Sequence, residues 1–213
     1  MKKKKRKLNV KRVLIVLILI ALIVVGGFLT INKYFKGSKT KEAKHVDKIE
    51  AYGYTLRDDA TSYYKSLFKK LDKVLKSKNV DEEEYSELVS KMFVADFFNL
   101  DNKTSKNDVG GKEFVYSDYV TDFEKFAMSG MYKSVESNVY GNRKQELPVV
   151  KEVTVTKGDS ISYNYGDKTD DKAYVYNFEI EYADDLGYQT KGSLILIHNG
   201  KKLEVASMSK KSA

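Results

Sequence analysis

The spacing of apolar residues changes along the chain and divides it into three parts. Residues 13–32 form an apolar run without a charged side chain. From residue 55 to about residue 138, apolar residues recur every three or four positions, the spacing of amphipathic helices. After Pro148 the spacing becomes two, which is typical of strands with one buried face. The pattern predicts an apolar segment, then helices, then a sheet.

The apolar run has the length of a membrane-spanning helix. At about 1.5 Å rise per residue, a helix over residues 13–32 is about 30 Å long, which matches the hydrocarbon core of a bilayer. Every charged side chain in residues 1–12 is Lys or Arg, which predicts a cytoplasmic N-terminus. The run lacks an A-x-A cleavage site, so we expect an uncleaved anchor in the cell membrane. Residues 33–47 are expected to form a polar stalk, and residues 48–213 an extracytoplasmic domain.

Three helices are predicted in the first half of that domain. The first covers residues 55–76, with an apolar stripe on one face and Lys residues on the other. The second begins after Asp81, where the sequence DEEE supplies a capping carboxylate and acidic residues in the first turn. The third runs from Ser117 to about residue 138. Gly130 lies inside it, and because Gly destabilises a helix by about 1 kcal/mol, we expect a break or a close contact there.

Five strands are predicted in the second half. They cover residues 149–156, 161–165, 173–183, 188–198 and 201–208. Asn199-Gly200 is a strong hairpin signal before the last strand. In the third strand, Tyr176 and Phe178 point to one face and Glu179 to the other. Helices followed by such a meander predict an α+β domain, with three helices packed on one face of an antiparallel sheet of about five strands.

The order of these elements resembles that of a known fold, although only the architecture is similar. A sheet that wraps as a cone around a long N-terminal helix resembles the nuclear transport factor 2-like (cystatin-like) fold. One anchor helix joined to such a domain is similar to assembly factors of type IV secretion and conjugation machines, which implies a role in an envelope complex. The segments YGYTL at residues 52–56 and LDNKTSKNDVGG at residues 100–111 also resemble uncharacterised membrane-anchored proteins of low-GC Gram-positive bacteria. These resemblances match no motif residue, so they imply no functional residue.

Charge and cysteine content narrow the classes of partner and site. The chain has 38 basic and 30 acidic residues, a formal net charge of +8. The basic excess lies in residues 1–12, whereas the charges of residues 13–213 balance. We therefore expect no nucleic-acid partner, and we expect the basic tail to contact anionic lipid. The sequence has no Cys, which excludes disulfides, thiol nucleophiles and Cys metal sites.

Motifs for catalysis or metal binding fail on their details. Ser62 and Lys65 match the S-x-x-K pattern of acyl-serine enzymes, but the pattern recurs in this Lys-rich chain without its companion motifs SDN and KTG. The loop DNKTSKNDVGG has Lys106 where a calcium-binding EF-hand needs Gly. The two histidines, His45 and His198, are expected in the stalk and at a hairpin end. We therefore expect no catalytic residue, no metal and no cofactor.

Asp96 and a pair of glycines are the anomalies of the helical half. Asp96 is the one charged residue in the apolar end of the second helix, FVADFFNL. We expect its carboxylate to form hydrogen bonds at the helix end, although a buried acid in a pocket is also what an enzyme would use. Gly110 and Gly111 are expected to adopt backbone conformations that other residues cannot.

The strongest candidate surface is a set of aromatic residues on the predicted sheet. It consists of Tyr163, Tyr165, Tyr174, Tyr176, Phe178, Tyr182 and Tyr188. These rings can form the core between sheet and helices. They can also line a pocket or a partner surface, because a buried Tyr needs a partner for its hydroxyl.

Three functions remain open at this point. The leading hypothesis is a non-enzymatic, membrane-anchored interaction module of a cell-envelope complex, whose partner is another envelope protein or a second copy of the chain. The alternative is an extracytoplasmic ligand-binding or sensory domain with a Tyr-lined pocket. An envelope hydrolase comes third, because the sequence offers no convincing catalytic residues.

Overall fold

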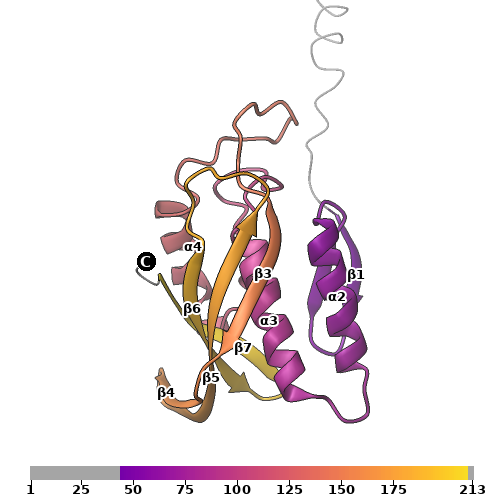
Figure 1. Cartoon of the computed structure of the whole chain (residues 1–213), viewed down its shortest axis with the longest axis vertical. Coiled ribbons are helices and arrows are strands. Elements are labelled where there is room, and N and C mark those ends of the chain that lie inside the picture. The colour runs from indigo at the N-terminus through magenta and orange to yellow at the C-terminus, as the bar shows by residue number, and fades with distance from the viewer. Residues whose placement is uncertain (1–43, 211–213) are drawn as a thin grey trace, which may run out of the picture. The chain divides into compact units, whose positions relative to one another are not determined.

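The computed structural model describes residues 44–210, whose arrangement is shown in Figure 1. In chain order its main elements are β1 (His45–Ile49), β2 (Tyr54–Arg57), α2 (Ser62–Leu75), α3 (Glu82–Phe97), α4 (Val120–Ser129), β3 (Val150–Lys157), β4 (Ile161–Tyr165), β5 (Lys168–Tyr182), β6 (Lys191–Asn199) and β7 (Lys202–Lys210). Short 3-10 helices η1 (Lys112–Phe114) and η2 (Ser117–Tyr119) precede α4. For this part of the chain, the predicted α+β class is confirmed, with three helices and an antiparallel sheet of five strands.

The predicted basic tail, the membrane anchor at residues 13–32 and most of the stalk lie outside the described residues. Within residues 44–210, no helix is both long and apolar enough to span a bilayer. β1 begins at His45, so regular structure starts inside the expected stalk, ahead of the predicted domain boundary at residue 48.

The main sheet has β3, β5, β6 and β7 in that order, with β4 paired to the first half of β5. β5 is 15 residues long, which lets it pair with β4 at one end and with β3 and β6 at the other. The alternation predicted along β5 is confirmed, because Tyr176 and Phe178 are buried whereas Glu179 and Glu181 are exposed. The two glutamates therefore lie on a solvated face, not in a cleft.

α3 is the central helix and lies between α2 and the sheet in Figure 1. It begins where the sequence predicts, since the Asp81 carboxylate accepts hydrogen bonds from the backbone N–H groups of Glu83 and Glu84. Its apolar C-terminal half is buried on nearly every side, as the sequence FVADFFNL predicts. The end of this helix also forms one wall of the site described below.

The first helix is shorter than predicted. Residues 55–57 belong to β2, and α2 begins at Ser62, after an N-cap in which the Thr61 hydroxyl accepts a backbone hydrogen bond. The prediction of a helix from residue 55 was wrong because Leu56 fits a helical stripe and a strand equally well. Pairing with β1 favours the strand, because it buries both Tyr54 and Leu56 in the core.

The third helix ends at Ser129, well before its predicted end. Gly130 ends it with φ −109° and ψ −104°, so the expected break is confirmed and the continuation beyond it was wrong. Tyr132 leaves the helical path and buries its ring completely. Its hydroxyl donates to the Phe97 carbonyl at 2.6 Å and accepts from the Gly110 N–H at 3.0 Å. This tertiary anchoring, which apolar spacing does not reveal, prevents the helix from continuing.

Candidate functional site

The aromatic residues predicted as a surface pack into two separate cores. Tyr176 and Phe178 are 2% and 3% exposed, and the Tyr176 hydroxyl pairs with the Ser86 hydroxyl of α3 at 2.7 Å. Three more of the predicted residues, Tyr174, Tyr182 and Tyr188, are half-buried against the same core. The Tyr182 hydroxyl has a partner as well, since it donates to the Gln189 carbonyl at 2.8 Å.

The other two predicted tyrosines belong to a smaller cluster on the opposite face of the sheet. Tyr165 of β4 packs edge-to-face on Tyr116, with ring centroids 5.1 Å apart. Tyr163 is half-buried against the same cluster. The seven aromatic residues thus fill cores, and none of them lines the cleft described next.

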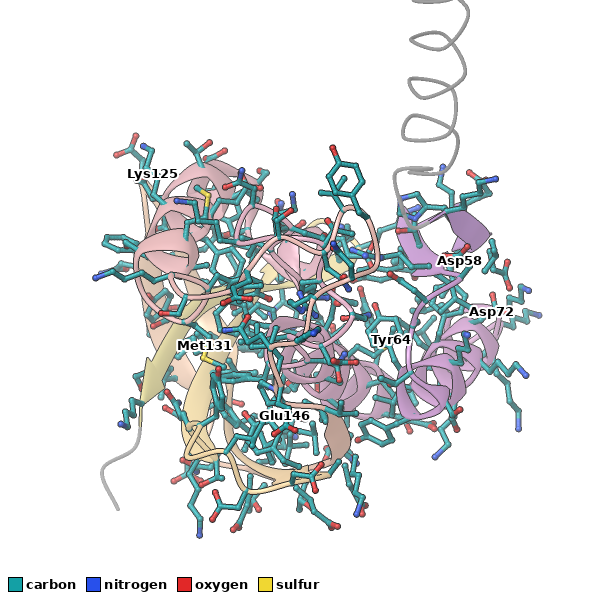
Figure 2. All side chains as sticks on the ribbon, turned by 90° about the horizontal axis from the view of Figure 1, so that it is seen from above. Asp58, Tyr64, Asp72, Lys125, Met131 and Glu146 are labelled. Carbon is teal, nitrogen blue, oxygen red and sulfur yellow. The ribbon has the colours of Figure 1, made fainter. Side chains whose placement is uncertain are left out.

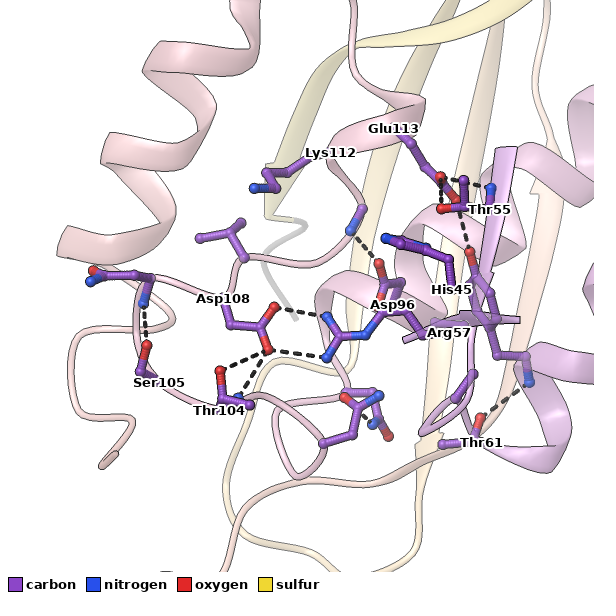
Figure 3. Close-up of a pocket in the computed structure, with 18 residues that line it drawn as sticks. His45, Thr55, Arg57, Thr61, Asp96, Thr104, Ser105, Asp108, Lys112 and Glu113 are labelled. Atoms are coloured by element: carbon purple, nitrogen blue, oxygen red, sulfur yellow. Dashed lines mark hydrogen bonds and ion pairs between the residues drawn. The ribbon is translucent and has the colours of Figure 1, made fainter. Parts of the chain in front are cut away.

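A cleft of about 610 Å³ lies on the α2 side of the molecule. One wall consists of β2 and the start of α2, and the other of the end of α3 with residues 99–113, which we call the cleft loop (Figure 3). Viewed from above in Figure 2, Tyr64 faces inward from α2 whereas Asp72 faces outward. The lining is rich in hydroxyl, amide and charged groups, so a polar ligand suits it better than an apolar one.

Arg57, at the end of β2, ties the hairpin to the cleft loop. Its guanidinium donates to both oxygens of Asp108 at 2.8 and 3.1 Å, and to both oxygens of Asp59 at 3.0 and 2.9 Å. Burial opposes ionisation of Asp108, but hydrogen bonds from Arg57 and from the Thr104 N–H lower its pKa to about 2. Asp108 is therefore a charged structural link whose oxygens are already occupied.

Asp96 makes a second charged link, between α3 and the cleft loop. One oxygen pairs with the Lys103 ammonium at 2.5 Å, and the other accepts from the Gly111 N–H at 2.6 Å. Lys103 is fully buried. Burial alone would raise the pKa of Asp96, but the charge and hydrogen bond of Lys103, together with the hydrogen bond from the Gly111 N–H, outweigh it, so that pKa lies below its usual range. The predicted hydrogen bonding of Asp96 at the helix end is confirmed.

The glycine pair permits this close approach of loop and helix. A Cβ on Gly110 would lie 2.3 Å from the Asp96 carbonyl oxygen, closer than side-chain carbons come. Gly111 has φ +77°, in the left-handed region that favours glycine. The predicted backbone conformation is confirmed for Gly111, whereas Gly110 is required by the close approach and not by its conformation.

Glu113 of η1 differs from the other acids of the cleft. Its Oε2 accepts from the N–H and hydroxyl of Thr55, each at 2.9 Å, and its Oε1 accepts from the Tyr64 hydroxyl at 3.3 Å. These donors are neutral, and within residues 44–210 the carboxylate forms no ion pair. Burial raises the pKa of Glu113 to about 7, against these hydrogen bonds and with help from the negative charge of Asp96.

A second, smaller cleft of about 260 Å³ lies beside His198. The His198 Nδ1 is 2.7 Å from Asp170, and its Nε2 is 3.2 Å from Glu82. Carboxylates therefore lie within hydrogen-bond distance of both ring nitrogens. His198 is thus a polar clamp at the hairpin end where it was predicted, and it joins β5, β6 and α3. Among residues 44–210, no group of three or more acids and histidines could hold a metal ion.

Sequence reasoning singled out Asp96, but it missed Arg57, Asp108 and Glu113. Arg57 and Asp108 are 51 positions apart, and Thr55 and Glu113 are 58 apart, so no local pattern links them. Each looks like an ordinary surface charge in a chain that is 32% charged.

No family model, no curated protein and no solved structure matches the chain.

Proposed function

We propose that the protein is a membrane-anchored, extracytoplasmic binding domain that holds a small polar ligand in the cleft between β2, α2 and the cleft loop. The observation that carries this proposal is the cleft itself. Its volume of about 610 Å³ falls within the range of roughly 300–1,000 Å³ typical of small-molecule sites. Its lining offers hydroxyl and amide groups that can orient a polar ligand, among them Thr61, Ser105 and Asn107.

The walls of the cleft support binding because they are fixed before a ligand arrives. Arg57 and the Asp96–Lys103 pair hold the cleft loop against β2 and α3. A preformed site loses little conformational entropy on binding, so more of the interaction energy appears as affinity. We propose no catalytic role for Asp96 and Asp108, because the oxygens of both carboxylates are already engaged by structural partners.

The cellular setting of the proposal comes from the sequence outside the described residues. Residues 13–32 would anchor the chain in the cell membrane, with the basic tail inside the cell and in contact with anionic lipid. The cone-like sheet inferred from the resemblance is supported by the long β5, which pairs with β4 at one end and with β3 and β6 at the other. The balanced charge of residues 13–213 supports a partner other than nucleic acid.

A second candidate is an interaction module of an envelope complex. It would bind another envelope protein or a second copy of the chain. The observation that favours it is an exposed ring on α4, where Phe126 is 77% exposed, together with Tyr140 at 64% in the loop that follows α4. Exposed aromatic rings are enriched at protein interfaces. A secretion or conjugation machine is the kind of complex that the architecture would fit.

Two experiments on the full-length protein separate these functions. The first is a thermal-shift screen of small polar molecules, in the wild-type protein and in Asn107→Trp, which places a large ring at an exposed position of the cleft lining. Binding that Asn107→Trp abolishes would support the cleft as the ligand site.

The second experiment is crosslinking in intact cells followed by mass spectrometry. Specific envelope partners that Phe126→Ser removes, with no ligand found for the cleft, would favour the interaction module.

A further inference from the structure

The cationic side chains that line the cleft already have carboxylate partners. Arg57 is held between Asp59 and Asp108. Lys112 pairs with Glu124 of α4 at 2.7 Å. Neither cation is therefore free to compensate another negative charge in the cleft.

Glu113 is the carboxylate left without such compensation. Its hydrogen bonds come from Thr55 and Tyr64, which are neutral. A carboxylate that is largely withdrawn from water is unfavourable unless a cation or a proton neutralises it. The hydrogen bonds orient the group at the wall of the cleft (Figure 3), but they do not cancel its charge.

The charged and titratable groups around Glu113 do not supply the missing cation. They come from five elements: His45 of β1, Tyr54 and Arg57 of β2, Tyr64 of α2, Asp96 of α3 and Lys202 of β7. Lys202 reaches only the backbone carbonyl of Glu113, at 3.4 Å, and its ammonium lies 3.5 Å from Glu204. Asp96 adds a further negative charge, which makes a cation in the cleft more favourable.

We propose that the ligand of the cleft carries a protonated amine or a guanidinium group, and that Glu113 is its counter-ion. This inference rests on the proposed function, because it names the chemical class that the cleft would bind. The remaining hydroxyl and amide groups of the lining would hold the polar body of the ligand, while Glu113 supplies selectivity for its charge.

Binding of a cation to Glu113 is linked to proton release. The pKa of Glu113 is about 7 in the free protein, and a bound cation favours the ionised carboxylate. Affinity should therefore rise with pH through this range. For a single linked proton, the Kd at pH 6 should be about tenfold weaker than at pH 8. Titrations in two buffers of different ionisation enthalpy would report the released proton directly.

The test uses two matched sets of compounds and the full-length protein, with binding measured by titration calorimetry at pH 8 and pH 6. One set is putrescine, butane-1,4-diol and succinate, which share a four-carbon chain. The other is glucamine, sorbitol and gluconate, which share a six-carbon polyol chain. We expect an amine member to bind about tenfold or more tightly than its neutral and anionic counterparts at pH 8. Glu113→Gln should remove both this preference and its pH dependence.

Two control variants locate the binding. His45→Gln changes the histidine that lines the cleft and should leave the preference for the amine intact. Asn107→Trp should abolish binding of every member. If a neutral or anionic member binds as tightly as the amine and Asn107→Trp blocks it, the amine inference is wrong and the cleft is still a binding site. If no member binds, or if binding ignores Asn107→Trp, the proposed function fails too.

Discussion

α3 joins two regions that are held together by different forces. On the sheet side, its buried contacts are apolar, and the buried polar atoms among them are neutral hydroxyls such as those of Ser86 and Tyr176. Charged contacts with the sheet occur only at the exposed start of the helix, where Glu82 contacts His198 and Glu83 pairs with Lys157, among the described residues. On the cleft side, Asp96 near its end and Arg57 of β2 hold the cleft loop through charged groups. Residues of one helix therefore take part both in a hydrophobic core and in the network of ion pairs that holds the cleft loop.

This difference explains why the cleft, and not the aromatic sheet, is the place for binding chemistry. Neutral hydroxyl pairs satisfy each other and leave nothing for a ligand to neutralise. In a network of ion pairs, each buried charge needs a counter-ion. Glu113 has only neutral hydrogen-bond donors, so its charge is the one that a ligand can neutralise. The two regions should therefore respond differently to mutation and to pH.

The largest effect is expected when Lys103, the buried cation of the ion-pair network on the cleft side, is replaced. Lys103→Met removes the partner of Asp96 and leaves a carboxylate without its counter-ion. We expect a loss of about 3–5 kcal/mol in the free energy of unfolding at pH 7. The folded-state pKa of Asp96 is lowered, so the pair stabilises above the unfolded pKa and loses its effect as pH falls through the folded value. Urea unfolding at pH 7 and at pH 3 measures both effects.

The double variant Lys103→Met/Asp96→Asn is the control for that experiment. It removes the uncompensated charge, so it should recover part of the loss at pH 7. An equal loss at both pH values, with no recovery in the double variant, would show that Lys103 acts through packing and not through charge. Asp96→Asn that abolished binding with unchanged stability would contradict the structural role of Asp96.

Gly110→Ala tests whether the loop must lie this close to the helix. The added Cβ would meet the Asp96 carbonyl oxygen at 2.3 Å, so the backbone must shift. We expect a loss of about 2–3 kcal/mol, in the range of overpacked cores. Gly158→Ala is the matched control on the sheet side, because its nearest atoms lie at an ordinary 3.7 Å. A similar small change in both variants, measured by thermal unfolding, would mean that the cleft loop is loosely attached.

Sequence reasoning recovered the two regions unequally, for physical reasons. Apolar spacing predicted all five strands of the sheet side and the burial of Tyr176, because a packed face imposes its period on the residues that form it. The hairpin of β1 and β2 was missed, since a strand of four residues such as Tyr54–Arg57 is too short to show a period.

The cleft was harder to predict because its order comes from charges and not from a period. Asp96 was found, since a charge inside an apolar helix end is conspicuous. Glu113 was not, because its raised pKa comes from burial, which the folded chain alone produces, and its partners Thr55 and Tyr64 are distant in sequence. Ion pairs between distant segments leave no local signature in a chain with many charges.

Glu113→Gln sharpens the comparison because it should stabilise the protein. The pKa of Glu113 rises from 4.5 to about 7 on folding, so the folded state holds this proton more tightly. Stability should therefore fall as pH rises from about 4.5 to 7 and then level off. Gln imitates the neutral acid and removes that fall, which gives a gain of about 1–3 kcal/mol at pH 8 and little change at pH 4.5. Urea titrations at both pH values measure the gain, and Glu181→Gln, on the exposed face of β5, should give none.

The smallest effect is expected on the sheet side, from Tyr176→Phe. This change removes a hydroxyl that pairs with Ser86 at 2.7 Å and leaves the buried ring in place. We expect a loss of about 1 kcal/mol, the usual size for one neutral hydrogen bond. The loss should be the same at pH 5 and pH 8, because neither partner ionises in that range, and ligand binding in the cleft should be unaffected. A pH-dependent loss, or weaker binding of a cleft ligand, would show that the two regions are coupled through α3 and that the contrast between them is too sharply drawn.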